Sequence, residues 1–261
     1  MTPRPILVTT VWQVKYCLFC LSLRFLLYHI CDKVKSIMIE QNIVFDDFGP
    51  YAALWCGTDV EPGDLARAVD FAINQNMDMV SVAPQCVKLI WPWLEKSKVK
   101  ILSRFYVMDK KITEQKISDI TININSVLKN GADGAQIFMR YQSVADLVEQ
   151  VHVVKDDLFF NKDLIIGLDI ADVGPYDWND LFQNLRKVNA AALTLVMTQD
   201  LKDKSDFPGR VYGMLNAWTS ENKFDLHFVV GNNPFRIEQV MRITKLIQPQ
   251  LLENMRFFVN H

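Results

Sequence analysis

The sequence predicts an α/β fold, and within that class a closed (β/α)8 barrel of the TIM type. Short apolar runs alternate with amphipathic stretches along most of the chain, which indicates parallel strands joined by helical crossovers. The runs are almost continuously apolar, as expected for strands that are buried on both faces. Eight such runs follow one another after residue 50. That number favours a closed barrel over an open doubly wound sheet, which is the alternative fold that the pattern allows.

The strands are assigned to short runs that end at glycine or polar residues. Their predicted ranges are 52–56, 79–82, 99–105, 135–138, 164–170, 191–197, 211–215 and 226–230, after a short entry strand at 43–45. The connections at 198–210 and 217–225 are short for complete helices, and 255–259 is one further apolar run. We therefore expect the barrel to be irregular around strands six to eight, or the last run to be an additional strand.

Helical spacing of apolar residues fills the intervals between these runs. The first helix is predicted to begin within 59–64. Five further helices are predicted at 87–94, 112–128, 143–151, 176–188 and 235–247. The helix at 112–128 is expected to end at Gly131, because glycine just beyond a helix readily adopts the left-handed conformation that closes it.

The segment 131–137, with the sequence GADGAQI, joins the end of this helix to the next strand. It resembles the helix-to-strand joint of aldolase-type (β/α)8 barrels, in which Gly-Ala-Asp-Gly commonly introduces the fourth or a later strand. The resemblance implies a barrel over residues 52–248. It implies no particular reaction, because the same joint occurs in lyases, flavoprotein oxidoreductases and isomerases. No predicted strand end carries a lysine that would match the family's Schiff-base residue, so lysine-dependent aldolase chemistry is disfavoured.

Composition excludes several classes of protein. The chain has 28 basic and 30 acidic residues and a net charge of −2, so its bulk charge predicts no nucleic-acid partner. Five cysteines in 261 residues are an odd number without a disulfide framework, which favours a reducing compartment and a cytoplasmic location. A homo-oligomer is compatible with this composition.

Residues 1–37 differ in composition from the rest of the chain, and we treat them as an apolar N-terminal extension to a single barrel domain at 38–261. Residues 6–30 are rich in large apolar side chains, although Gln13, Lys15, Arg24 and His29 interrupt them. Three interpretations fit: a segment upstream of a natural start at Met38, a membrane anchor, or an amphipathic helix packed on the domain. A membrane partner is expected only under the second interpretation.

Chemistry in such a barrel is expected at the carboxyl ends of the strands. Arg104, Arg140 and Asp169 are charged residues within or directly after apolar runs, where a charge must be paired or solvated. We predict that Asp169 is the catalytic acid or base and that the two arginines bind an anionic substrate. Further substrate-binding residues are predicted from their positions near strand ends: Gln136, Ser103, Asn216, Gly231 and Asn232. An internal arginine–aspartate ion pair is the structural alternative.

Motifs for cofactors and metals are weak. The four histidines have no ligand spacing, so no metal ligands are predicted, and the absence of a Rossmann fingerprint or P-loop leaves the cofactor unknown. The leading hypothesis is a lyase or isomerase that acts on a small anionic, and in one version phosphorylated, metabolite by acid/base chemistry without a Schiff-base lysine. The alternative is a non-catalytic ligand-binding or interaction protein on the same scaffold.

Overall fold

A computed structural model describes residues 51–260, except 110, 152–161, 198–205 and 232. The strands and helices alternate along the chain. They are β1 (Ala52–Trp55), α3 (Pro62–Asn74), β2 (Met79–Val82), α4 (Pro84–Leu94), β3 (Lys100–Val107), α5 (Glu114–Lys129), β4 (Gly134–Met139), η2 (Tyr141–Ser143), α6 (Val144–Val151), β5 (Asp163–Asp169), η3 (Ile170–Asp172), α8 (Trp178–Lys187), β6 (Ala192–Val196), α9 (Asp206–Ala217), β7 (Asp225–Val229), α10 (Pro234–Ile247), η4 (Pro249–Asn254) and β8 (Met255–Asn260). All of these elements belong to one compact unit, Phe48–His261.

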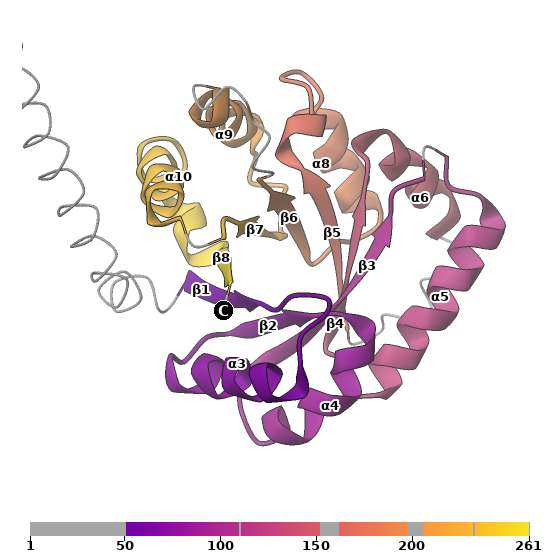
Figure 1. The fold of residues 1–261 in the computed structure, drawn as a ribbon. Coiled ribbons are helices and arrows are strands. Elements are labelled where there is room, and N and C mark those ends of the chain that lie inside the picture. The colour runs from indigo at the N-terminus through magenta and orange to yellow at the C-terminus, as the bar shows by residue number, and fades with distance from the viewer. Residues whose placement is uncertain (1–50, 110, 152–161, 198–205, 232, 261) are drawn as a thin grey trace, which may run out of the picture. The chain divides into compact units, whose positions relative to one another are not determined.

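The eight strands form a closed barrel in sequence order. Every neighbouring pair is parallel, and β8 pairs with β1 to close the sheet. The helices surround the strands in chain order from α3 to α10 (Figure 1). The predicted (β/α)8 barrel is therefore confirmed, and the open doubly wound sheet is excluded.

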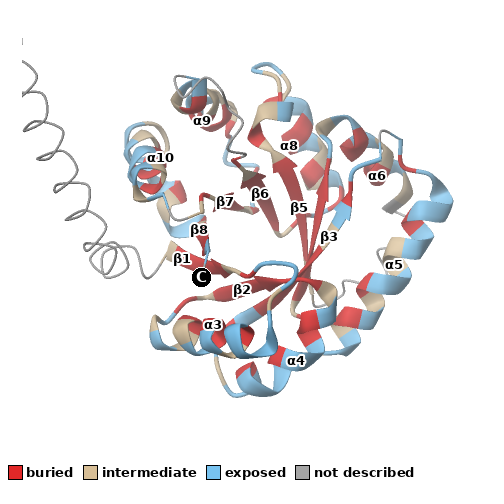
Figure 2. Cartoon of the chain, viewed as in Figure 1, coloured by how far each residue is buried: buried red, intermediate tan, exposed pale blue. Residues whose placement is uncertain are grey.

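Burial separates the strands from the outer faces of the helices. The strands are buried almost throughout, whereas exposed residues lie on the outward sides of the helices (Figure 2). The innermost cluster takes apolar side chains from six strands: Ala53, Met79, Leu102, Ile165, Ala192 and Phe258. Successive residues of a strand point to opposite faces of the sheet. These six positions therefore identify which residues of their own six strands face the barrel interior.

Strand seven was assigned to the wrong run. The expected strand at 211–215 lies within α9, whose buried residues Phe207, Val211, Met214 and Leu215 follow helical spacing. A short apolar run cannot be distinguished from part of a helix by its periodicity alone. The true seventh strand is β7, and the additional run at 255–259 is β8. The expected irregularity around strands six to eight resulted from this misassignment.

The helix-to-strand joint has the predicted geometry. Helix α5 ends at Lys129, Asn130 is its C-cap, and Gly131 follows with φ of 107°. A Cβ atom at Gly131 would lie within 2 Å of the Trp91 ring, so the tryptophan packs directly on the glycine backbone. Glycine is therefore required at this position both by the conformation and by the close approach of α4.

Ion pairs lie at the amino-terminal end of the barrel. Lys100 Nζ lies 2.9 Å from Asp163 Oδ2, and Arg256 Nε lies 2.6 Å from Asp78 Oδ2. Burial raises the pKa of the neighbouring Asp225, although Arg256 and Lys100 oppose this shift. Lys100 is the one lysine in a described strand, and it is paired at the end of the barrel opposite the carboxyl ends of the strands.

No helix among the described residues is long and apolar enough to cross a bilayer. The expectations for residues 1–37, for the boundary at 38 and for the entry strand at 43–45 lie outside the described residues.

Candidate functional site

The carboxyl half of the barrel interior contains a buried arginine. Arg104 follows Leu102 by two residues on β3 and therefore faces inward, and only 1% of its surface is exposed. Its guanidinium donates hydrogen bonds to the backbone carbonyl oxygens of Cys56 and Ser81, which lie just after β1 and near the end of β2. The guanidinium carbon lies 4.0 Å from the centroid of the Trp55 ring, in a cation–π contact.

No carboxylate among the described residues lies within ion-pair distance of Arg104, and its Nε has no acceptor there. Burial lowers the pKa of Arg104, whereas Tyr106, Cys56 and Cys86 shift it in the opposite direction. The guanidinium nevertheless remains charged because its ordinary pKa is so high. The interior therefore holds a positive charge that carbonyl dipoles and an aromatic face stabilise in place of a negative charge. The internal Arg–Asp ion pair considered from the sequence is not formed by Arg104 and any described aspartate.

A chain of polar side chains crosses the barrel at the level of Arg104. Gln136, which is paired with Arg104 in the β3–β4 register, accepts a hydrogen bond from Ser81 Oγ at 2.5 Å and donates one to Thr194 Oγ1 at 3.3 Å. Thr194 Oγ1 lies 3.5 Å from His227 Nδ1. Burial, with smaller contributions from the positive charges of Arg256 and Lys100, lowers the pKa of His227 to about 3. The neutral imidazole is thus part of the packed interior, and the oxygen and nitrogen of the Gln136 amide each make one hydrogen bond within it.

Aromatic side chains fill the space between this polar level and the carboxyl-terminal rim. The rings of Phe138 and Trp55 meet edge to face, with their centroids 5.5 Å apart. The Tyr106 ring stacks on the Phe138 ring at a centroid distance of 5.3 Å. The absence of a side chain at Gly167 makes room for the Phe138 ring, since a Cβ atom there would lie 2.2 Å from Cδ1 of the ring. Tyr106 closes this aromatic column, made of Trp55, Phe138 and Tyr106, and is 51% exposed.

Opposite charges gather at the rim beyond the column. Phe138 on β4 pairs with Gly167 on β5. Two residues after each of them come Arg140 and Asp169, and both have an extended backbone. Arg140 is exposed, and Asp169 accepts a hydrogen bond from the Ala171 amide at 2.8 Å. Burial and the neighbouring Asp169 raise the pKa of Asp172, whereas Arg140 opposes the rise. Arg140, Asp169 and Asp172 are therefore close enough to interact electrostatically.

The remaining predicted binding residues are distributed differently. Ser103 is adjacent to Arg104 and is buried on the outer face of β3, so the two side chains point to opposite faces of the sheet. Asn216 is exposed near the end of α9, which runs back to the amino-terminal side of the barrel, so its predicted position at a strand end is wrong. Gly231, with φ of 59°, follows β7 at the mouth, and Asn232 lies outside the described residues.

Tyr106 and Phe138 were missed as parts of the site, although their signal was present in the sequence. Tyr106 continues the inward alternation of Leu102 and Arg104, and Phe138 continues that of Gln136. Two further arginines that the sequence did not single out fix the mouth loops. Arg210 donates to the carbonyls of Ile170, Ala171 and Val173, and Arg236 donates to the carbonyl of Met197. These arginines hold backbone that follows β5 and β6.

Metal binding has no support from the described side chains, which contain no group of three or more histidine, cysteine, aspartate or glutamate residues arranged to hold an ion. Cys56 and Cys86 are buried and unpaired near Arg104. Burial raises the pKa of Cys56 to about 11, although the charge of Arg104 opposes this. Both thiols are therefore protonated at neutral pH and are poor nucleophiles.

Comparison with known proteins identifies the class of fold. No protein-family model and no curated protein matches the chain, but solved (β/α)8 structures do. A putative deoxyribose-phosphate aldolase from Toxoplasma gondii ME49 is 14% identical, with a TM-score of 0.60 over 85% of this chain and 91% of its own. The tetrameric deoxyribose-phosphate aldolase of Aeropyrum pernix is 12% identical, with a TM-score of 0.57 over 83% and 87%.

A putative copper homeostasis protein, CutC, from Streptococcus agalactiae is 9% identical, with a TM-score of 0.58 over 80% of this chain and 98% of its own. At these identities the likeness shows the (β/α)8 barrel fold, as the sequence resemblance implied, and nothing about the reaction.

Proposed function

We propose that this barrel is an enzyme of the lyase or isomerase type that acts on a small anionic metabolite at its carboxyl-terminal mouth. The observation that carries the proposal is the buried Arg104 guanidinium, which has no carboxylate partner among the described residues. An unneutralised charge in a poorly solvated interior is costly, and a bound anion would offset that cost. Arg140 adds a second positive charge at the rim, and Asp169 is the acid or base.

No described strand carries a lysine at its carboxyl end, which supports acid/base chemistry over Schiff-base chemistry. A Schiff-base lysine needs a desolvated position near the reacting carbon so that its amine is neutral. The one lysine in a described strand, Lys100, has its pKa raised mainly by its hydrogen bond to Asp163. The deoxyribose-phosphate aldolases that share the fold act on a phosphorylated sugar by name, which supports a phosphorylated metabolite as the anion. The tetramer of the Aeropyrum protein supports a test for a homo-oligomer.

Replacing Arg104 with methionine tests the anion site. We expect phosphorylated sugars or carboxylates to raise the melting temperature of the wild-type chain, because a ligand at 100 times its Kd adds about 2.7 kcal/mol to stability. In Arg104→Met this ligand-dependent shift should decrease, because the buried charge attracts an anion bound at the mouth above it, while the unliganded protein should keep its stability to within about 1 kcal/mol, because removal of an unpaired buried charge offsets the lost contacts. Thermal unfolding with and without each anion measures both quantities.

Arg242→Met is the matched control, because Arg242 is an exposed arginine that pairs with Glu238 on α10. It should leave the ligand shift unchanged. A strongly destabilised Arg104→Met protein that retained the anion shift would show that the guanidinium is a structural group, and the proposal would fail.

Replacing Asp169 with asparagine tests the acid/base role. Asparagine can still accept the hydrogen bond from Ala171, so we expect the fold and the anion shift to persist while turnover of the ligand found in the screen falls by about 10²–10⁴-fold. Asp119→Asn, at an exposed carboxylate on α5, is the control and should retain full turnover. An unchanged rate and pH profile in Asp169→Asn would remove this residue from the mechanism.

The aromatic column favours a second function, a binding protein without catalysis. Trp55 and Phe138 occupy space above Arg104 in which a reacting substrate would have to lie. On this view the barrel binds its anion at the rim without transforming it. This function would be favoured if anions raise the melting temperature of the wild-type protein but none of the bound metabolites is turned over.

A further inference from the structure

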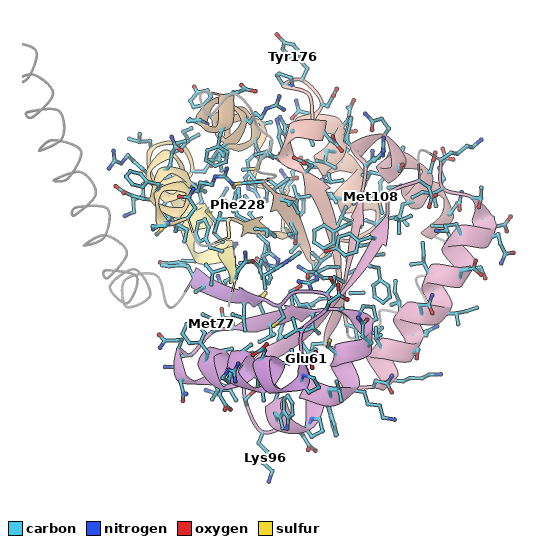
Figure 3. The ribbon with its side chains drawn as sticks, viewed as in Figure 1. Glu61, Met77, Lys96, Met108, Tyr176 and Phe228 are labelled. Carbon is cyan, nitrogen blue, oxygen red and sulfur yellow. The ribbon has the colours of Figure 1, made fainter. Side chains whose placement is uncertain are left out.

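The rim contains an exposed aromatic ring that neither the buried arginine nor the acid/base role requires. Tyr106 is 51% exposed, and Met108, which directly follows the end of β3, is exposed to the same extent. Figure 3 labels Met108 at the end of β3 and Tyr176 in the loop after β5, both on the side of the barrel toward which β3 and β5 point. Large apolar groups exposed beside a charged rim commonly mark a binding surface.

We propose that Tyr106 is a stacking platform and that the anion bound at this mouth carries a planar unsaturated ring. The inference rests on the proposed function and narrows its substrate class from small anions in general to aromatic or conjugated ones. The planar ring would lie on the solvent-facing side of Tyr106, with its anionic group directed to Arg140.

The orientation of the Tyr106 ring is fixed by the aromatic side chains on its barrel-interior side. One face of its ring stacks on Phe138 with an interplanar angle of 26°, and Phe138 is in turn held edge to face by Trp55. Because Gly167 admits the Phe138 ring into the sheet, this ring cannot withdraw without leaving a cavity. A platform that is already ordered loses little conformational entropy when a ligand ring stacks on it.

The charge beside the platform is positioned for an anionic substituent. Tyr106 pairs with Phe138 in the β3–β4 register, and Arg140 follows Phe138 by two residues, just beyond the end of β4, with an extended backbone. The face of an aromatic ring repels anions, so a negative group must lie at its edge and needs a separate cation. Arg140 is exposed directly after β4, the strand that pairs with the strand of Tyr106, and provides that cation.

A pair of matched probes separates stacking from charge. Phenyl phosphate and cyclohexyl phosphate have the same anionic group and similar size, but only the first has a planar π system. We expect the full-length protein to bind phenyl phosphate about tenfold more tightly by titration calorimetry, a difference of ~1.4 kcal/mol. Tyr106→Phe should keep this preference, whereas Tyr106→Leu should lose it and retain the affinity for cyclohexyl phosphate.

Two further variants complete the test. Tyr212→Leu removes an equally exposed tyrosine, from α9, and should leave both affinities unchanged. Arg140→Met should weaken both probes equally, because it removes the charge and leaves the platform.

Equal affinity of the wild-type chain for the two probes would overturn the stacking inference and leave the proposed anion site standing. A phenyl preference that persists in Tyr106→Leu would overturn it as well. Failure of both phosphates, of inorganic phosphate and of the carboxylates in the thermal screen to bind would overturn the proposed function together with this inference.

Discussion

Replacing Gly167 with alanine is expected to lower the free energy of unfolding by about 3 kcal/mol, near the top of the range for overpacked cores. The new Cβ atom would meet three atoms of the Phe138 ring, the nearest at 2.2 Å. The ring has no free direction in which to move, because Tyr106 stacks on it and Trp55 meets it edge to face. Urea denaturation of the purified variant measures the loss.

A double-mutant cycle identifies the cause of that loss. Phe138→Ala alone should also destabilise the protein, because it leaves a cavity, but in its background Gly167→Ala should cost less than about 1 kcal/mol. Gly63→Ala is the control, since no atom lies within 4 Å of its added Cβ and alanine favours the helix. An undiminished penalty in the Phe138→Ala background would show that another contact is responsible.

The sequence predicted the barrel because its strands carry an unambiguous signal where they are buried on both faces. The runs at 79–82 and 135–138 correspond closely to β2 and β4, and the glycine-terminated helix before β4 ends as expected. The pattern failed at 211–215, where the apolar positions Val211, Met214 and Leu215 of one helix fall close together and imitate a strand. Local hydrophobicity alone does not distinguish these cases, because the partner surface decides between them.

The candidate site was predicted less completely than the fold, and the reason is geometric. Arg104, Arg140 and Asp169 could be selected as charges in apolar surroundings, but their depth could not be read from the sequence. Depth depends on register: Arg104 is level with Gln136, whereas Arg140 lies four residues after Gln136, just beyond the end of β4. The two arginines therefore occupy different levels of the mouth, with the Trp55–Phe138–Tyr106 column between the interior and the rim.

Acidification is expected to destabilise the protein through His227. This side chain is fully buried, and its pKa of about 3 lies well below the ordinary value of 6.5. The unfolded chain therefore binds a proton that the folded chain excludes. The contribution to stability is complete above pH 6.5 and is lost as the pH falls from 6.5 toward 3, at up to about 1.4 kcal/mol per pH unit. Between pH 7.5 and pH 5 the loss amounts to about 2 kcal/mol.

The variant His227→Asn isolates this contribution, because asparagine does not titrate and can still meet Thr194. Carboxyl groups with raised pKa values, Asp172 and Asp225, act in the opposite direction: the stability they contribute is present at low pH and is lost as the pH rises through their folded pKa values. They are common to both proteins, so the difference between the two stability profiles from pH 5 to 7.5 reports His227 alone. Parallel profiles would mean that the imidazole accepts a proton in the folded barrel, and the polar chain from Ser81 to His227 would then be open to ionisation at the level of Arg104.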